Sequence, residues 1–386
     1  MLFESRLTSQ FLDAVAQIQH GTLAITTPDG VLHEFQGPHP GPHGDLAIHD
    51  WRAIAALAAR GDIGMTEAYR DHWCDTRDLE ALIMVAMLNI DALHPYIFGR
   101  RWQALITRAL YALNRNSRSG AKRNIRAHYD LGNDFYSLWL DESMTYSSAL
   151  FQPDDDLHMA QQRKYDRIID HLAGASGRLL EIGCGWGGFA ERALERGDFA
   201  PKGLTLSHEQ ADYARERLGP HADIALQDYR DETSRYDHVV SIEMFEAVGE
   251  RYWPTYFGKL AQVLSDKGRA MIQTITIADD LFNVYRRGPD MIRSFIFPGG
   301  MLPSPSRFEA EASRAGLRIE ESFNFGFSYA RTLREWLKRF DLCQVQVRAM
   351  GFDDEFIRVW RMYLAACAAS FATGRTDVVQ YQLSHA

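Results

Sequence analysis

A glycine-rich segment near the middle of the chain is the first place where residue type and spacing suggest chemistry. Residues 179–182 form a short apolar run that predicts a buried strand, and residues 189–194 have the apolar spacing of a helix. Three alternating glycines stand between them: Gly183, Gly185 and Gly187. Glycines at such a turn allow positive φ angles and let a nucleotide lie against main-chain N–H groups. A lone glycine-rich loop is also an ordinary turn, so the prediction depends on Glu181 and on the segments that follow.

Polar side chains follow the next two predicted strands. The second strand ends in Thr205, Leu206 and Ser207, and Gln210 comes shortly after. Dinucleotide-binding folds usually carry a ribose-binding acid at this point. Hydroxyls and an amide in its place disfavour NAD and favour another nucleoside ligand. Asp228, after the third strand, could face an adenine amino group or could cap a turn.

An acid and two mixed stretches complete the candidate site. Residues 127–136 and 144–151 combine aromatic and polar side chains upstream of the glycine loop, which suits a lid or a ligand wall better than plain core. Glu246 stands just past the fourth predicted strand. A buried acid there could stabilise a cation or take a proton, or it could be a helix N-terminal acid favoured by the helix dipole.

Alternating strand and helix patterns are expected to position these groups. The predicted strands are 178–182, 202–206, 224–226, 238–242 and 270–275, and the helices begin after 188 and span 208–218 and 252–264. This alternation predicts an α/β fold with a doubly wound, mainly parallel sheet. Ligands of such sheets bind at the carboxyl ends of the strands, where the glycine loop lies.

The first part of the chain reads as a separate, smaller and mostly helical domain. Residues 23–35 predict a hairpin around a Pro-Asp-Gly turn, residues 37–42 a further turn, and helical spacing then recurs through 51–57 and 79–93. The polar, glycine-terminated residues 114–120 are the best candidate linker. We therefore expect an N-terminal domain of residues 1–114 and a catalytic domain of residues 115–386.

Composition excludes several classes of protein. The net charge of −9 gives no global basic field for nucleic acid, and four scattered cysteines predict reduced thiols without a structural metal site. No apolar stretch approaches the ~20 residues of a membrane span, and the start lacks the pattern of a secretory signal. Residues 100–126 carry eight Lys and Arg and no acid, so this segment could contact anionic lipid or could be a solvated helix and linker.

Several ordered motifs together closely resemble the cyclopropane-fatty-acyl-phospholipid synthase family. The motifs are Glu-Ile-Gly-Cys-Gly-Trp-Gly from 181, Thr-Leu-Ser from 205 with Gln210, Leu-Gln-Asp-Tyr-Arg-Asp from 226, Met-Phe-Glu from 244, Phe-Pro-Gly-Gly from 297 and Tyr-Ala-Arg-Thr-Leu from 329. The resemblance covers nearly the whole chain. It implies a class I methyltransferase fold and transfer of a methyl group from S-adenosylmethionine to the double bond of an unsaturated phospholipid acyl chain.

The resemblance also implies roles for individual residues. The residues expected to bind S-adenosylmethionine are Tyr129, Tyr146, Ser147, Gly183, Gly185, Trp186, Gly187, Thr205, Leu206, Gln210, Gln227 and Asp228. Glu246 and Tyr329 match residues that hold a bicarbonate ion, the proposed base of the family, and Ile275 matches a backbone N–H donor to that anion. Aromatic faces can stabilise a carbocation, and the candidates are Tyr146, Trp186, Phe245 and Tyr329.

Two positions depart from the family pattern. Ser148 replaces a cysteine that is thought to act through its backbone, and Gln273 replaces a histidine. Glutamine cannot become cationic and holds an anion less strongly. The methyl transfer is therefore the expected activity, and the final product can be a cyclopropane, a methylated alkene or a methyl branch.

The surroundings and the alternatives follow from the same resemblance. It implies a homodimer and a phospholipid substrate. The scattered cysteines predict a cytoplasmic protein, which would meet that phospholipid at the inner face of the membrane. N-methylation of a small amine stays open, because relatives of this fold act on alkaloid amines. A lipid-binding protein that has lost catalysis also stays open, on Ser148 and Gln273 alone. A flavin- or NAD-linked oxidoreductase is disfavoured because no ribose-binding acid follows the second strand.

Overall fold

The computed structural model describes residues 2–97 and 131–386, which form two compact units. Of these residues, the first unit takes 2–97, 284–298 and 341–375, and the second takes 131–283, 299–340 and 376–386. Segments 284–298 and 341–375 thus group with the N-terminal residues. This differs from the two consecutive domains, 1–114 and 115–386, that the sequence suggests. The expected linker at 114–120 and the basic segment 100–126 lie outside the described residues.

The first unit has a four-stranded sheet surrounded by helices. Its strands are β1 (His20–Thr26), β2 (Leu32–Gln36), β3 (His39–Ile48) and β4 (Cys74–Asp75), in the order β2-β1-β3-β4. Its N-terminal helices are α1 (Leu2–Val15), α2 (Arg52–Arg60), α3 (Asp62–Arg70), α4 (Leu79–Leu88) and α5 (Ile90–Ile97). Segments from later in the chain add η5 (Ile292–Ile296), α16 (Gln344–Ala349) and α17 (Asp354–Ala372). The predicted hairpin is confirmed, because β1 and β2 pair antiparallel around Gly30.

One local prediction for this unit is wrong. The prolines of residues 37–42 do not make a free turn, because β3 begins at His39 and runs parallel to β1. Pro40 and Pro42 are tolerated because β4 pairs only with the far end of β3, at Ala47 and Ile48. The helical spacing expected over 79–93 is confirmed by α4 and α5, which are separated at Asn89. The Asn89 side-chain oxygen accepts from the backbone N–H groups of residues 19 and 20.

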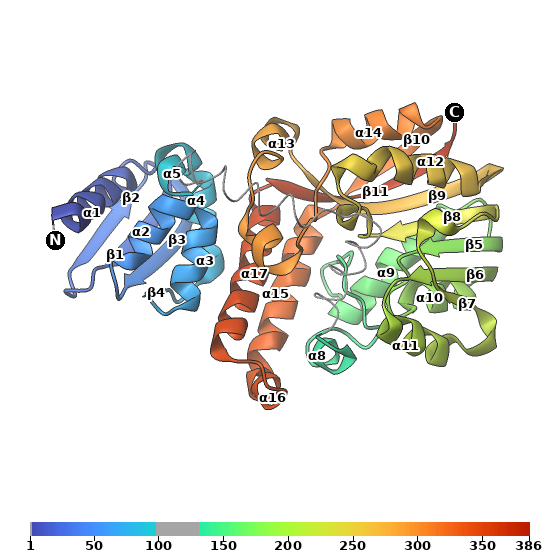
Figure 1. Cartoon of the computed structure of the whole chain (residues 1–386), viewed down its shortest axis with the longest axis horizontal. Helices are drawn as coiled ribbons and strands as arrows, with labels where there is room; N and C mark the ends of the chain where they lie inside the picture. Colours follow the sequence, from blue (N-terminus) through green and yellow to red (C-terminus); the bar gives the residue numbers. More distant parts are fainter. Residues whose placement is uncertain (1, 98–130) are drawn as a thin grey trace. The chain divides into compact units, whose positions relative to one another are not determined.

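The second unit is the expected doubly wound α/β fold (Figure 1). Its seven strands are β5 (Ser176–Ile182), β6 (Asp198–Thr205), β7 (Asp223–Leu226), β8 (Tyr236–Ile242), β9 (Leu264–Ile277), β10 (Leu317–Asn324) and β11 (Thr376–His385). The order is β10-β11-β9-β8-β5-β6-β7, parallel from β9 to β7 and antiparallel at β9, β11 and β10. The five strands predicted from the sequence are all present, whereas the antiparallel β10 and β11 were not predicted.

Helices cover both faces of this sheet (Figure 1). The helices packed on the faces are α9 (Leu157–Asp170), α10 (Gly188–Arg196), α11 (His208–Leu218), α12 (Trp253–Val263) and α14 (Pro305–Arg314). The unit also contains α8 (Asn133–Ser137) and most of α15 (Gly326–Leu342), and the residues of α13 (Asp279–Tyr285) are divided between the two units. Side chains alternate between the faces of a strand. Ile168 of α9 packs with Met271 of β9 on one face, and Phe308 of α14 stacks on Tyr381 of β11 on the other, with ring centroids 4.2 Å apart.

None of the helices within residues 2–97 and 131–386 is long and apolar enough to cross a membrane. In the same residues there is no group of three or more His, Cys, Asp and Glu side chains placed to hold a metal ion.

Candidate functional site

The glycine loop joins β5 to α10 with the backbone geometry that the sequence predicts. Gly183, Gly185 and Gly187 have φ angles of +83°, +51° and +84°. The N–H groups of Gly183 and Cys184 donate to the carbonyl of Leu204 on β6, each at 2.9 Å. A Cβ atom added at Gly185 would meet no atom within 4 Å, whereas one at Gly183 would lie 2.9 Å from Met244. The backbone around Gly185 is therefore open to a ligand.

The polar residues after β6 and β7 come together at the carboxyl edge of the sheet. The Thr205 hydroxyl donates to Gln210 Oε1 at 2.8 Å, and both side chains are buried. The Gln227 N–H donates to the Thr205 carbonyl at 3.0 Å, which places the end of β7 beside the end of β6. Asp228 caps the following turn and pairs with Arg230, so the capping role is confirmed, and a contact with adenine stays a prediction.

Most of the predicted aromatic residues form one continuous cluster. The ring of Tyr136 lies 5.2 Å from Trp186 and 5.3 Å from Tyr146. Tyr146 in turn lies 5.3 Å from Trp336, which lies 6.1 Å from Tyr329, all between ring centroids. Three candidates for stabilising a cation, Tyr146, Trp186 and Tyr329, therefore belong to one aromatic wall.

Phe245 and Tyr129 are not placed in this wall. The Phe245 side chain is fully buried, and its ring packs against Trp253, Tyr256 and Phe308 from helices α12 and α14. A ring enclosed by other rings has no free face, so the expected cation role of Phe245 is wrong. Tyr129 lies outside the described residues.

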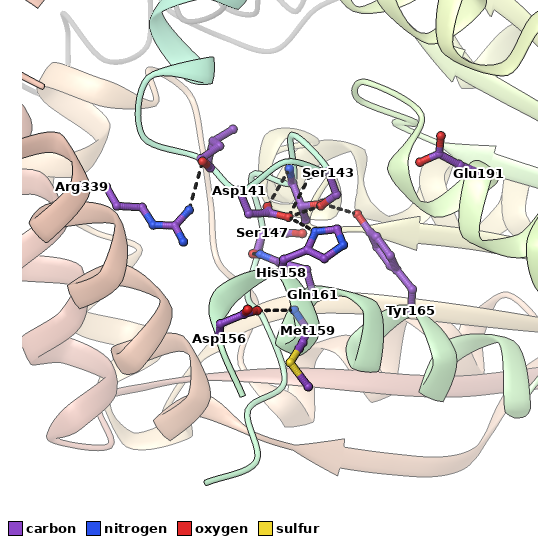
Figure 2. A network of polar contacts seen from close by, with 12 residues as sticks. Asp141, Ser143, Ser147, Asp156, His158, Met159, Gln161, Tyr165, Glu191 and Arg339 are labelled. Atoms are coloured by element: carbon purple, nitrogen blue, oxygen red, sulfur yellow. Dashed lines mark hydrogen bonds and ion pairs between the residues drawn. The ribbon is translucent and has the colours of Figure 1, made fainter. Parts of the chain in front are cut away.

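A buried polar network fixes the segment that carries Tyr146, Ser147 and Ser148. Figure 2 shows Asp141, Ser143 and His158 pointing toward one another. Asp141 Oδ2 accepts from the Ser143 hydroxyl at 2.5 Å and lies 3.1 Å from His158 Nδ1. The Ser143 and Thr145 hydroxyls lie 2.6 Å apart, and Thr145 is bonded to the Tyr165 hydroxyl at 2.8 Å. Satisfied buried networks of this kind hold a loop in one conformation.

Two side chains of α9 hold Ser147 directly. Gln161 Nε2 donates to the Ser147 carbonyl at 2.9 Å, and the fully buried Lys164 ammonium donates to the Ser147 hydroxyl at 2.7 Å. Burial lowers the pKa of Lys164 to about 7, although the charges of Glu243 and Glu181 act in the opposite direction. Burial also raises the pKa of Glu181 well above its usual range. The Lys164 amine therefore lies under the site among acids, and burial disfavours the charged forms of both Lys164 and Glu181.

The central group of the site is Glu243, which sequence reasoning missed. The Ser148 N–H and Gln273 Nε2 donate to Glu243 Oε1 at 2.8 Å and 2.7 Å, and the Tyr329 hydroxyl donates to Oε2 at 2.6 Å. Glu243 has a φ angle of +49°, a conformation in which non-glycine residues are rare and which often marks a functional site. The signal available was a second acid, three residues before Glu246, at the end of a buried strand.

Glu246 lies beside Glu243 and accepts hydrogen bonds from two other donors of strand β9. Glu246 Oε1 accepts from the Ile275 N–H at 2.5 Å and from the Thr274 hydroxyl at 3.0 Å. Burial and then the charge of Glu243 raise the pKa of Glu246 to about 8. Burial also raises the pKa of Glu243, but the donors from Tyr329 and Ser148 oppose this shift. Burial therefore favours a proton on Glu246 at neutral pH, and the three donors to Glu243 favour the negative charge of the pair there.

The predicted catalytic residues thus lie together, but they contact two carboxylates of the protein in place of the expected bicarbonate ion. Ser148, Gln273 and Tyr329 contact Glu243, and Ile275 contacts Glu246. The Ser148 hydroxyl donates to the Ala149 carbonyl, so only the backbone N–H of Ser148 faces the site. This agrees with the expectation that serine is tolerated at this position.

The raised pKa of Glu246 predicts how the free energy of unfolding depends on pH. The folded-state pKa of about 8 exceeds the usual value of 4.5, so the folded protein binds this proton more tightly and loses stability as pH rises between these values. Glu246→Gln removes this loss. We expect it to raise the free energy of unfolding by ~1–2 kcal/mol more at pH 8 than at pH 5, measured by urea denaturation. The exposed Glu195→Gln is the matched control, and an equal effect of Glu246→Gln at both pH values would contradict the prediction.

Comparison with known proteins identifies the family of the chain. A model of the mycolic acid cyclopropane synthetase family matches residues 116–381. The tuberculostearic acid methyltransferase UfaA1 of Mycobacterium tuberculosis is 39% identical over 355 residues, which cover 88% of this chain and 82% of that protein. The cyclopropane-fatty-acyl-phospholipid synthase of Escherichia coli K12 is 36% identical over 331 residues, 85% of this chain and 84% of that protein.

Solved structures give the same result. The mycolic acid cyclopropane synthase CmaA1, complexed with SAH and CTAB, is 31% identical and aligns with a TM-score of 0.64. The alignment covers 68% of this chain and 97% of CmaA1. The match to the family model over residues 116–381, together with relatives 36–39% identical over most of their length, shows that this chain belongs to the mycolic acid cyclopropane synthetase family.

Proposed function

We propose that this protein transfers a methyl group from S-adenosylmethionine to the double bond of an unsaturated acyl chain in phospholipid, with Glu243 as the group that takes the proton released. The observation that carries the proposal is the convergence of Ser148, Gln273 and Tyr329 on the Glu243 carboxylate beside the aromatic wall. The named activities of the relatives, which act on acyl chains, support the substrate class.

The residues at the carboxyl edge of the sheet fit S-adenosylmethionine. The open backbone at Gly185 leaves room for the ligand, and the buried Thr205 and Gln210 offer polar groups where a ribose-binding acid is absent. When bound, S-adenosylmethionine supplies an electrophilic methyl carbon. The residues proposed to hold it are Tyr146, Ser147, Gly183, Gly185, Trp186, Gly187, Thr205, Leu206, Gln210, Gln227 and Asp228, with Tyr129 proposed from the sequence alone.

The site does not fit a separate bicarbonate ion. Three of the donors expected for that ion, from Ser148, Gln273 and Tyr329, bind the Glu243 carboxylate, and the fourth, from Ile275, binds Glu246. A bicarbonate ion in the same place would find these donors already occupied, and its negative charge would be repelled by the Glu243 carboxylate. We therefore assign the role of the base to Glu243 and no step to bicarbonate.

The reaction follows from these positions. The electron pair of the double bond forms the new bond to the methyl carbon while the methyl–sulfur bond breaks and leaves its electron pair on sulfur. The other carbon of the former double bond becomes cationic. The faces of Tyr146, Trp186 and Tyr329 stabilise this cation, and Glu243 then takes one proton. A proton lost from the added methyl group closes a cyclopropane ring, whereas one lost from a neighbouring carbon leaves a methylated alkene.

The activity is tested in cells that express the protein and receive methyl-labelled methionine. We expect gas chromatography with mass spectrometry to show labelled membrane fatty acids that contain one additional carbon atom. A ring product would identify a cyclopropane synthase, and a labelled methyl on a chain that keeps its double bond would identify a C-methyltransferase. Absence of labelled lipid, with protein that is expressed and folded, would contradict the proposed function.

Replacing the internal carboxylate tests the role of Glu243. Glu243→Gly suits the positive φ angle and leaves the three donors free for a small anion. We expect turnover to fall ~100-fold or more, as for loss of a general base, and to be restored in part by added formate or bicarbonate. The matched variant Glu243→Gln fills the space and should be equally slow without rescue. S-adenosylmethionine affinity should stay within about twofold in both variants, and wild-type turnover that depends on bicarbonate would contradict this role.

Contact with the membrane surface and a homodimer remain proposals. A phospholipid substrate requires the protein to reach the inner face of the membrane, and the basic segment 100–126 is proposed to bind anionic headgroups there. Sedimentation with vesicles containing phosphatidylglycerol should show binding that weakens as salt rises. Vesicles of phosphatidylcholine are the control, and binding that does not change with salt would contradict electrostatic docking.

A further inference from the structure

A second glutamine lies directly behind Gln273. Gln380 on β11 and Gln273 on β9 are register partners across the antiparallel strand pair, and each side chain is only 1% exposed. Gln380 Nε2 donates to Gln273 Oε1 at 2.9 Å. On the far side, Arg167 Nη1 of α9 donates to Gln380 Oε1 at 2.8 Å. Arg167, Gln380, Gln273 and Glu243 therefore form one continuous series of hydrogen bonds.

The groups at the two ends of this series, the Arg167 guanidinium and the Glu243 carboxylate, determine which way each glutamine amide is turned. A guanidinium group only donates hydrogen bonds, so Gln380 must turn its oxygen toward Arg167. Its NH₂ group is then left for the oxygen of Gln273, and the NH₂ group of Gln273 is left for Glu243, at 2.7 Å. An ionised carboxylate only accepts, which agrees with this direction. Without such an anchor, a glutamine amide could present either its oxygen or its nitrogen to Glu243.

Arg167 is itself held in place. Its guanidinium pairs with Glu321 of β10, and its Cζ atom lies 4.0 Å from the ring centroid of Phe323 on the same strand. The Arg167 side chain is 14% exposed. An arginine clamped between an acid and a ring has one arrangement, so it can transmit its direction to Gln380.

We propose that Arg167 and Gln380 are positioning residues, which keep the Gln273 amide turned as a donor to Glu243 and so keep Glu243 ionised and able to take the proton. This inference rests on the proposed function, in which Glu243 is the base. It extends the site to two residues that do not contact Glu243 themselves.

Other charged and titratable groups also face Glu243. Lys164 from α9 favours the anion, and Tyr329 from α15 stabilises it as a donor. Glu246 opposes it whenever Glu246 is ionised. The hydrogen-bond series from Arg167 is therefore one of several contributions to the ionised state of Glu243. Its test must reverse the two glutamine amides while Lys164, Tyr329 and Glu246 stay unchanged.

Gln380→Glu reverses the direction of the series. The new carboxylate still accepts from Arg167, but it can only accept from Gln273 as well, so the Gln273 amide must turn its NH₂ group to residue 380 and its oxygen to Glu243. We expect the acidic limb of the kcat–pH profile to move up by ~1–2 pH units, with roughly tenfold lower kcat at pH 7. KM for the lipid and affinity for S-adenosylmethionine should change by less than about twofold.

Three further variants separate direction from added charge and from damage to the fold. Gln382→Glu adds the same charge on the same face of β11, where the native amide donates to the His171 carbonyl instead, and it should leave the pH limb unchanged. Gln380→Leu removes the series without adding charge and should shift the limb in the same direction by less. Adding Gln273→His to Gln380→Glu should restore most of the activity, because an imidazolium ion can donate to both carboxylates.

A measurement that needs no lipid distinguishes this inference from the proposed function. Infrared difference spectra between the protein and its Glu243→Gln variant report whether Glu243 is ionised at each pH. The expected result is a Glu243 titration that moves upward in Gln380→Glu and not in Gln382→Glu. An unmoved titration in folded Gln380→Glu, or an equal move in Gln382→Glu, would overturn the positioning role. A moved titration with an unmoved kcat–pH profile would instead show that Glu243 is not the base.

Discussion

The carboxylate of Glu243 and its three hydrogen-bond donors are the interaction on which the rest of the site depends. The donors come from three separate parts of the second unit: the segment before α9, strand β9 and helix α15. A partly buried carboxylate is stable as an anion only when hydrogen-bond donors are already held in place around it. These donors replace the water lost on burial, so each missing donor destabilises the charge. The polar network around Asp141, the α9 contacts to Ser147 and the series behind Gln273 all serve to fix one of these donors.

The pair of acids also determines where negative charge is favoured in the site. Two neighbouring carboxylates in a poorly solvated place share one proton, and the better-bonded one stays ionised. Glu243 accepts three hydrogen bonds and Glu246 two, which favours the charge on Glu243, whose donor Tyr329 belongs to the aromatic wall. The arrangement costs stability as pH rises, because the proton on Glu246 becomes harder to keep. A site that must attract a short-lived cation needs this excess of negative charge.

Local patterns in the sequence predicted most of the second unit. The five parallel strands, the glycine loop and the polar residues after β6 were all expected, because each depends on a short run of neighbouring residues. The failures have physical causes as well. Prolines at 40 and 42 usually mark turns, yet they are accepted here on the unpaired edge of β3. Phe245 follows a strand like the other site residues, but its backbone turns the ring into the core beneath α12 and α14.

By itself the sequence determined the family, the parallel part of the second unit's sheet and the identity of most candidate site residues. These conclusions depend on residue types at fixed spacing, which local backbone geometry converts into strands, turns and caps. Only the tertiary structure decided what those residues contact. Glu243 enters the anion site because residue 243 adopts a positive φ angle after β8, and Gln380 lies behind Gln273 because β11 inserts next to β9 from more than 100 residues away in the sequence. Pairing between distant strands depends on the whole packed sheet, so no local pattern could predict it.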